Sequence, residues 1–134
     1  MRAILSLLFL DPRYTNLRYR WAILLYLAVV FMGSIPGARA SIGNYASGLV
    51  LHSLAYAVLT VLLFTGSNGS ATQRAVKSIL TVAVLGALDE FIQSFFPYRR
   101  ASVIDWAVDC NAAIIVSLLL RAAWPRLTGS AAPS

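Results

Sequence analysis

A polar block at residues 87–111 carries the side chains of this chain that could do chemistry. It reads ALDEFIQSFFPYRRASVIDWAVDCN and contains four of the five acidic residues of the protein. The runs on either side of it, TVAVLG and AAIIVSLLL, are almost wholly apolar. Carboxylates beside amide, hydroxyl and guanidinium groups can pair with one another, hold a polar ligand or exchange protons. We therefore expect the function to be located in this block.

The composition predicts that the elements around this block are membrane helices. Mean hydropathy is +0.74, and 59% of the residues are hydrophobic against 12% charged. A soluble domain carries about twice that charged fraction. Apolar runs of roughly 18–20 residues recur without a polar stripe, and such a run can cross a bilayer as a helix. We predict an all-α fold: a small polytopic membrane helix bundle with four transmembrane helices and a short N-terminal interfacial helix.

Turn and cap signals divide the chain into three parts. Residues 1–18 form an N-terminal interfacial and cytoplasmic segment, interrupted at Asp11-Pro12. Residues 19–123 form the membrane domain, with helices expected at about 20–35, 46–64, 75–96 and 102–123. Pro36-Gly37, Pro97 and Trp124-Pro125 are expected to end helices, and Ser102 is expected to cap the last one. Residues 124–134 are expected to form a flexible tail.

Residues 38–40, Ala-Arg-Ala, resemble a signal-peptidase site, and cleavage there would leave three spans. The long basic segment before the first helix argues against cleavage.

The basic residues indicate an orientation. With four spans, eight of the eleven fall on one side and three on the other, which favours both termini in the cytoplasm. The first set is Arg2, Arg13, Arg18, Arg20, Arg74, Lys77, Arg121 and Arg126, and the second is Arg39, Arg99 and Arg100. The net charge of +6 is not gathered into one patch interleaved with aromatic residues, so we do not predict nucleic-acid binding.

Helix geometry predicts that three helices bring polar side chains to one level of the outer leaflet. At 1.5 Å per residue, His52, Asp89 and Asp109 each lie about 10 Å below the outer helix ends. Exposure of an acid to lipid costs about 2.5–3.5 kcal/mol at the membrane centre, so these groups should face one another. We expect an outward-open polar pocket or cluster formed by His52, Tyr56, Asp89, Glu90, Gln93, Arg99, Ser102, Asp105 and Asp109.

The same residues resemble the motif of the VanZ-like membrane protein family. Its elements here are Asp89-Glu90, Gln93, Phe95, Pro97, Arg99, Ser102 and Asp105, with His52 and Tyr56 before an apolar run. The resemblance covers roughly residues 45–120. Gly48-Leu49 stand where the family usually has an aspartate-lysine pair, and Ala112 replaces a usual glycine. The resemblance implies a multi-helix protein of the bacterial inner membrane, in a family whose founding member is linked to teicoplanin resistance and which has no settled biochemical activity.

Three functions fit these residues. The first is an envelope protein whose pocket binds membrane lipids by their headgroup, a lipid-linked cell-wall precursor or a lipoglycopeptide-type ligand, because arginine suits phosphate. The second is an intramembrane acid/base enzyme acting on a lipid-linked substrate, although no nucleophile motif supports it. The third is a structural or assembly protein in which Asp89 and Arg99 form a buried ion pair. We predict no cofactor and no metal site, because His52 and the aspartates lack a tight ligand spacing. The sequence leaves a homo-oligomer open.

Overall fold

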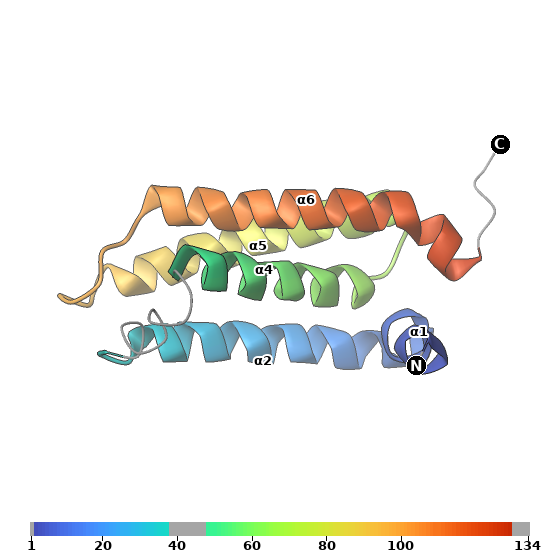
Figure 1. Cartoon of the computed structure of the whole chain (residues 1–134), viewed down its shortest axis with the longest axis horizontal. Coiled ribbons are helices and arrows are strands. Elements are labelled where there is room, and N and C mark those ends of the chain that lie inside the picture. The colour runs from blue at the N-terminus through green and yellow to red at the C-terminus, as the bar shows by residue number, and fades with distance from the viewer. Residues whose placement is uncertain (1, 38–47, 130–134) are drawn as a thin grey trace.

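The computed structural model describes residues 2–37 and 48–129, and across these residues every regular element is a helix and no strand occurs. The elements are α1 (Arg2–Leu10), the 3-10 turn η1 (Pro12–Tyr14), α2 (Thr15–Ser34), α4 (Gly48–Thr65), α5 (Ala71–Gln93) and α6 (Val103–Thr128). The four longer helices lie alongside one another, and α1 turns across the end of α2 (Figure 1). The all-α fold is confirmed for this part of the chain.

The helices alternate in direction, which decides what meets at each end of the bundle. α4 and α6 run one way and α2 and α5 the other, so the α5–α6 connection, the start of α4 and the end of α2 share one end (Figure 1). α1 and the C-terminal end of α6 lie at the opposite end. The polar block of residues 87–111 is therefore placed at the end away from α1.

Local signals explain most helix boundaries. Asp11 accepts a hydrogen bond from the backbone N–H of Arg13, and the helix α1 ends just before it, as Asp11-Pro12 predicted. Ser70 and Gln73 form a capping box, so α5 begins at Ala71 rather than near residue 75. The hydroxyl oxygen of Ser102 accepts from the Asp105 N–H at 3.3 Å, which confirms the predicted cap of α6.

Two predicted helix ends are wrong. α5 ends at Gln93 rather than residue 96, and the chain continues in tight turns in which the N–H groups of Phe95 and Phe96 bond to carbonyl oxygens three residues back. The residue before Pro97 is disfavoured in helical conformation, which accounts for the early end. α6 continues through Pro125 to Thr128 and ends at Gly129, whose φ of 68° is left-handed.

Many polar side chains are buried between the helices, and many large apolar side chains are exposed. The fully or nearly buried residues include several with charged or hydroxyl side chains: Arg18, Thr60, Ser78, Asp89, Glu90, Asp109 and Ser117. The exposed residues include Leu27, Phe31, Leu80, Phe91 and Leu119. A water-soluble protein shows the opposite trend, since charged groups are almost never buried without need. The outer surface of these helices is therefore suited to an apolar surrounding.

In the part of the chain that the structure describes, two helices are long and apolar enough to cross a membrane, one at Pro12–Ser34 and one at Val103–Thr128. The apolar part of α4, Val50–Thr65, is shorter. The small hydrophobic core lies between α2, α4, α5 and α6 and consists of Ala22, Tyr26, Tyr56, Leu59, Leu63, Val82 and Ala113. The cleavage site considered at residues 38–40 and most of the expected tail, residues 130–134, lie outside the described residues.

Candidate functional site

α4 and α6 bring His52, Tyr56 and Asp109 together in the interior. Nδ1 of His52 lies 3.3 Å from Oδ1 of Asp109. His52 and Tyr56 are four residues apart on α4, and their rings stack with centroids 5.6 Å apart. Asp109 and Tyr56 are each only 1% exposed. The structure therefore brings these three predicted site residues together.

α5 contributes Asp89, Glu90 and Gln93, all of which are buried. Oε2 of Glu90 accepts a hydrogen bond of 2.6 Å from the backbone N–H of Ser102, at the start of α6. Glu90 also lies within electrostatic reach of Asp89, Asp105 and His52. We use the name inner acidic cluster for His52, Tyr56, Asp89, Glu90 and Asp109, which three helices supply.

Several oxygen atoms of the inner acidic cluster are buried without a partner. Within the described part of the chain, Tyr56 Oη, Glu90 Oε1 and Asp109 Oδ2 make no hydrogen bond. A buried polar atom left unsatisfied costs about 1–3 kcal/mol, and more if it is charged. Carboxylate oxygens accept hydrogen bonds, so the groups that would complete this cluster are donors such as hydroxyl, amine or water.

Arg99 is directed to the end of α2 rather than to Asp89. Its Nη1 donates to the carbonyl oxygen of Gly33 at 2.6 Å, and a Cβ atom at Gly33 would lie 3.5 Å from Nη2. The neighbouring Tyr98 donates from its hydroxyl to the carbonyl oxygen of Ser34 at 2.6 Å. Among the residues that the structure describes, no ion pair joins Asp89 to Arg99. The arginine thus ties the α5–α6 connection to α2.

A surface hollow of about 420 Å³ opens above the inner acidic cluster, and we call it the headgroup hollow. Its lining consists of Ile35, Pro36, Gly37, Tyr98, Arg99, Arg100, Ser102 and Asp105. Among the described residues that line it, two guanidinium groups and one carboxylate give a net positive charge. Ser102 joins the two sites, because its side chain lines the hollow while its N–H bonds to Glu90.

The predicted site residues thus divide between two adjoining places. His52, Tyr56, Asp89, Glu90, Gln93 and Asp109 are buried or half-buried within the helices, whereas Arg99, Ser102 and Asp105 line the headgroup hollow. Sequence reasoning missed Tyr98 and the segment Ile35–Gly37 as part of this lining. The Pro36-Gly37 signal predicted only a helix end, and nothing in the sequence indicates that this end reaches the α5–α6 connection.

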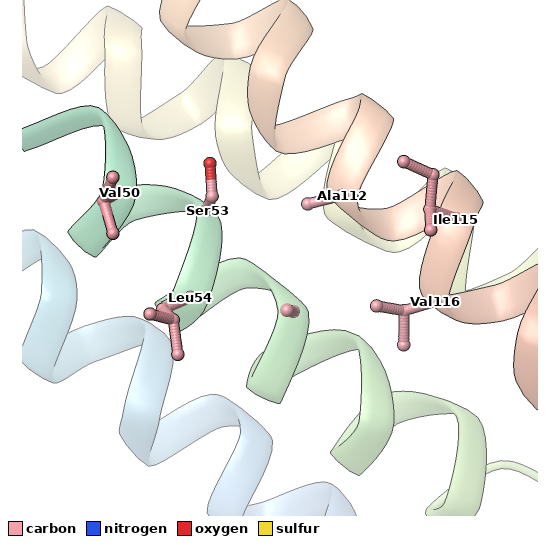
Figure 2. Close-up of a pocket in the computed structure, with 7 residues that line it drawn as sticks. Val50, Ser53, Leu54, Ala112, Ile115 and Val116 are labelled. Atoms are coloured by element: carbon pink, nitrogen blue, oxygen red, sulfur yellow. The ribbon is translucent and has the colours of Figure 1, made fainter.

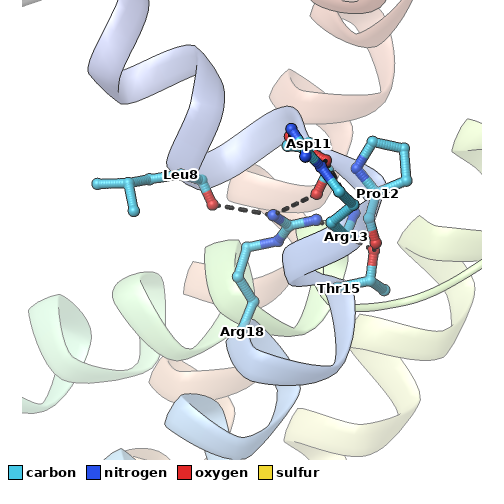
Figure 3. Close-up of polar contacts among 6 residues, drawn as sticks. All are labelled: Leu8, Asp11, Pro12, Arg13, Thr15 and Arg18. Atoms are coloured by element: carbon cyan, nitrogen blue, oxygen red, sulfur yellow. Dashed lines mark hydrogen bonds and ion pairs between the residues drawn. The ribbon is translucent and has the colours of Figure 1, made fainter.

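Sequence reasoning also missed a buried arginine at the other end of the bundle. Arg18 is 5% exposed, and its guanidinium donates to the carbonyl oxygens of Leu8, Asp11 and Thr65 and to the hydroxyl of Thr15, at 2.9–3.2 Å. Figure 3 shows the contacts to α1 and the corner that follows it. From its position in the sequence, Arg18 is indicated only as one of the basic residues that orient the helices.

No three His, Cys, Asp or Glu side chains converge in a way that could hold a metal ion within residues 2–37 and 48–129. No protein-family model matches the chain, and no curated protein or solved structure is significantly similar to it.

Proposed function

We propose that this chain is an integral membrane protein in which α2, α4, α5 and α6 all cross the bilayer. α5 has 23 residues, enough to span, and its polar residues Ser78, Asp89, Glu90 and Gln93 are turned into the bundle. α1 exposes Ile4, Leu5, Leu7 and Leu8, which suits a helix lying in the membrane interface. The excess of basic residues at the α1 end supports cytoplasmic termini, with the headgroup hollow facing outward.

We propose that the headgroup hollow binds the phosphate-bearing headgroup of a membrane amphiphile. The observation that carries this proposal is a net positive hollow that adjoins, through Ser102, a cluster with buried, unpartnered oxygen acceptors. Arg99 and Arg100 suit phosphate oxygens, because a guanidinium offers paired N–H donors. Glu90 and Asp109 suit hydroxyl or amine donors on the same headgroup. The ligand class is a hydroxylated or aminated phospholipid or lipid-linked wall precursor.

We propose, from the resemblance to the VanZ-like motif, that the protein belongs to the inner membrane of a bacterial envelope. The support is the spacing from Asp89 to Asp105, together with His52 and Tyr56 on the neighbouring helix. A link to glycopeptide resistance would then follow from binding a lipid-linked precursor or the lipoglycopeptide itself.

Native mass spectrometry in phosphatidylglycerol nanodiscs tests the headgroup site. We expect wild type to retain phosphatidylglycerol, and we expect Arg99→Gln and Arg100→Gln to lose it while remaining helical by circular dichroism. Arg126→Gln, an exposed arginine at the other end of the bundle, is the matched control and should retain the lipid. Equal retention by wild type and both hollow variants overturns the proposal and leaves the cluster a structural device.

An acid/base enzyme is a second candidate, favoured by the His52–Asp109 contact. A carboxylate within 3.3 Å of Nδ1 can orient the imidazole so that the other ring nitrogen exchanges a proton with a substrate. Incubation of purified protein with a lipid-linked pyrophosphate, followed by product analysis, distinguishes the two candidates. Turnover that His52→Gln abolishes supports the enzyme, and binding without turnover supports the binding protein.

A further inference from the structure

An apolar groove runs between α4 and α6 on the side of the molecule shown in Figure 2, with a volume of about 350 Å³. Val50, Ser53, Leu54 and Ala57 from α4 and Ala112, Ile115 and Val116 from α6 line it. Val50, Leu54 and Ile115 are about half exposed, so the groove is open along its rims. Apart from the Ser53 hydroxyl, every described side chain in the lining is apolar.

The lining determines the chemistry of an occupant. Within residues 48–129, the lining offers neither a charged group nor a second polar group to bind a headgroup, a peptide or an ion. The small side chains of Ala57 and Ala112 leave space between the larger Leu54 and Val116, which fits a narrow hydrocarbon chain. From Val50 to Ala57 the groove extends about 10 Å along α4, or two turns, which is short for packing a partner helix.

The groove continues the polar site toward the middle of the bundle. His52 lies between Val50 and Ser53 in the sequence, and its partner Asp109 precedes Ala112 by one turn. On α6, positions i, i+7 and i+11 return to nearly the same face, which places Asp105, Ala112 and Val116 in one stripe. Asp105 lines the headgroup hollow, so the hollow and the groove follow each other down one side of α6. A lipid of the outer leaflet has the same order, with its headgroup at the helix ends and its chains directed inward.

We propose that the α4–α6 groove holds one hydrocarbon chain of the lipid whose phosphate occupies the headgroup hollow. The proposal rests on the proposed function and adds that the protein recognises both the headgroup and a hydrocarbon chain of this lipid. Chain burial in the groove removes apolar surface from exchange with bulk lipid and fixes the lipid next to His52 and Asp109. The protein therefore distinguishes a chain-bearing phosphate from a free one.

The test compares a lipid with its chain-free headgroup. We measure the binding of two probes, phosphatidylglycerol in nanodiscs and soluble glycerol phosphate, to wild type, Ala112→Phe and Arg100→Gln. Ala28→Phe, an exposed position on α2, is the matched control. We expect Ala112→Phe to weaken phosphatidylglycerol about tenfold or more and to leave glycerol phosphate unchanged. We expect Arg100→Gln to weaken both and Ala28→Phe to weaken neither.

The outcomes separate the two proposals. If Ala112→Phe binds phosphatidylglycerol like wild type while Arg100→Gln does not, the groove proposal is overturned and the headgroup site stands. If neither change matters, both proposals are overturned. A second measurement needs no substitution: phosphatidylglycerol with a photoreactive group on its acyl chain should label wild type at Leu54, Ile115 and Val116. Labelling spread evenly over the exposed apolar residues of α2 and α5 overturns the groove proposal even if Ala112→Phe fails to fold.

Discussion

At the α1 end of the bundle, the buried guanidinium of Arg18 donates to three carbonyl oxygens and one hydroxyl, whereas the buried oxygens of the inner acidic cluster at the opposite end remain partly unpartnered within the described residues. Both ends bury charge at similar exposure, so burial alone does not distinguish them. The two ends differ in whether their buried polar atoms have hydrogen-bond partners. A satisfied buried charge stabilises a fold, while an incomplete set of acceptors is suited to something that arrives from outside.

Arg18→Met is the strongest test of the α1 end, where the buried guanidinium is hydrogen-bonded. The change leaves the carbonyl oxygens of Leu8, Asp11 and Thr65 without their donor, and we expect the free energy of unfolding to fall by about 2–4 kcal/mol. Arg18→Lys should recover only part of this loss, because an ammonium cannot reach all four acceptors in a fixed fork. Unfolding in mixed detergent micelles measures the effect, with the exposed Arg20→Met as control. If Arg18→Met and Arg20→Met have the same free energy of unfolding, the hydrogen bonds of Arg18 do not stabilise the fold, and the contrast with the inner acidic cluster is lost.

Gly66 provides a second test at the same end. A Cβ atom there would lie 2.7 Å from the carbonyl oxygen of Leu62 and 2.8 Å from the backbone nitrogen of Tyr19, and backbone atoms cannot move aside cheaply. We expect Gly66→Ala to lower the free energy of unfolding by about 1–3 kcal/mol. At the other end, Gly33→Ala meets only the Arg99 guanidinium at 3.5 Å and should be tolerated. A thermal melt of the two variants in one detergent makes the comparison, which fails if Gly33→Ala is the more damaging.

A substitution in the inner acidic cluster should reduce ligand binding more than it reduces stability. Asp109→Asn keeps the shape of the side chain and removes a buried charge, so we expect a change in stability within about 1 kcal/mol. We expect phosphatidylglycerol retention in nanodiscs to fall about tenfold, because a charged acceptor for the headgroup is lost. Asn111→Ala, on the exposed side of the same helix, is the control. Loss of stability with unchanged retention would make the inner acidic cluster a structural counterpart of the Arg18 site.

The smallest expected effect concerns pH at the corner between α1 and α2. Hydrogen bonds from the side chain and backbone of Arg13 hold the pKa of the Asp11 carboxyl below its ordinary value of 3.8. The ionised carboxylate therefore stabilises the corner at every pH above that value, and this contribution disappears as the pH falls through the lowered pKa. The Arg13 side chain is 77% exposed, so the effect is small.

The measurement is amide exchange at Arg13 during an acid titration. We expect its protection to decline at low pH in wild type and to be reduced and independent of pH in Asp11→Asn. A wild-type profile as flat as that of Asp11→Asn would contradict the assignment.

The sequence predicted the parts of the fold that depend on local signals. The Asp11-Pro12 break, the Ser102 cap and the all-helical class are confirmed for the described residues, since each depends on a few neighbouring side chains. The continuation of α6 through Pro125 was not predicted, because proline removes one hydrogen bond but does not by itself end a helix whose next turn remains helical.

The sequence predicted the site residues whose placement follows from helical spacing. It did not predict the contacts that join segments far apart in the chain. The spacing of His52 and Tyr56 and of Asp105 and Asp109 indicates shared faces, and the structure brings His52 to Asp109. The bonds from Arg99 to Gly33 and from Tyr98 to Ser34 join residues more than sixty positions apart, and no local pattern specifies them. The expected Asp89–Arg99 pair was inferred from charge alone, and the geometry of the α5–α6 connection directs the arginine elsewhere.

The contacts between α5 and α6 also bear on how the chain is made. The hydroxyls of Thr60 and Ser78 bond to carbonyl oxygens four residues back in their own helices, so these side chains are satisfied before any helix meets another. Glu90 has no such local partner and acquires the Ser102 N–H only when the next helix begins. The indole N–H of Trp106 likewise donates to the carbonyl oxygen of Ala83. In the proposed topology, in which both helices cross the membrane, we expect α5 and α6 to leave the insertion machinery as one hairpin, with α5 held back until α6 has been synthesised.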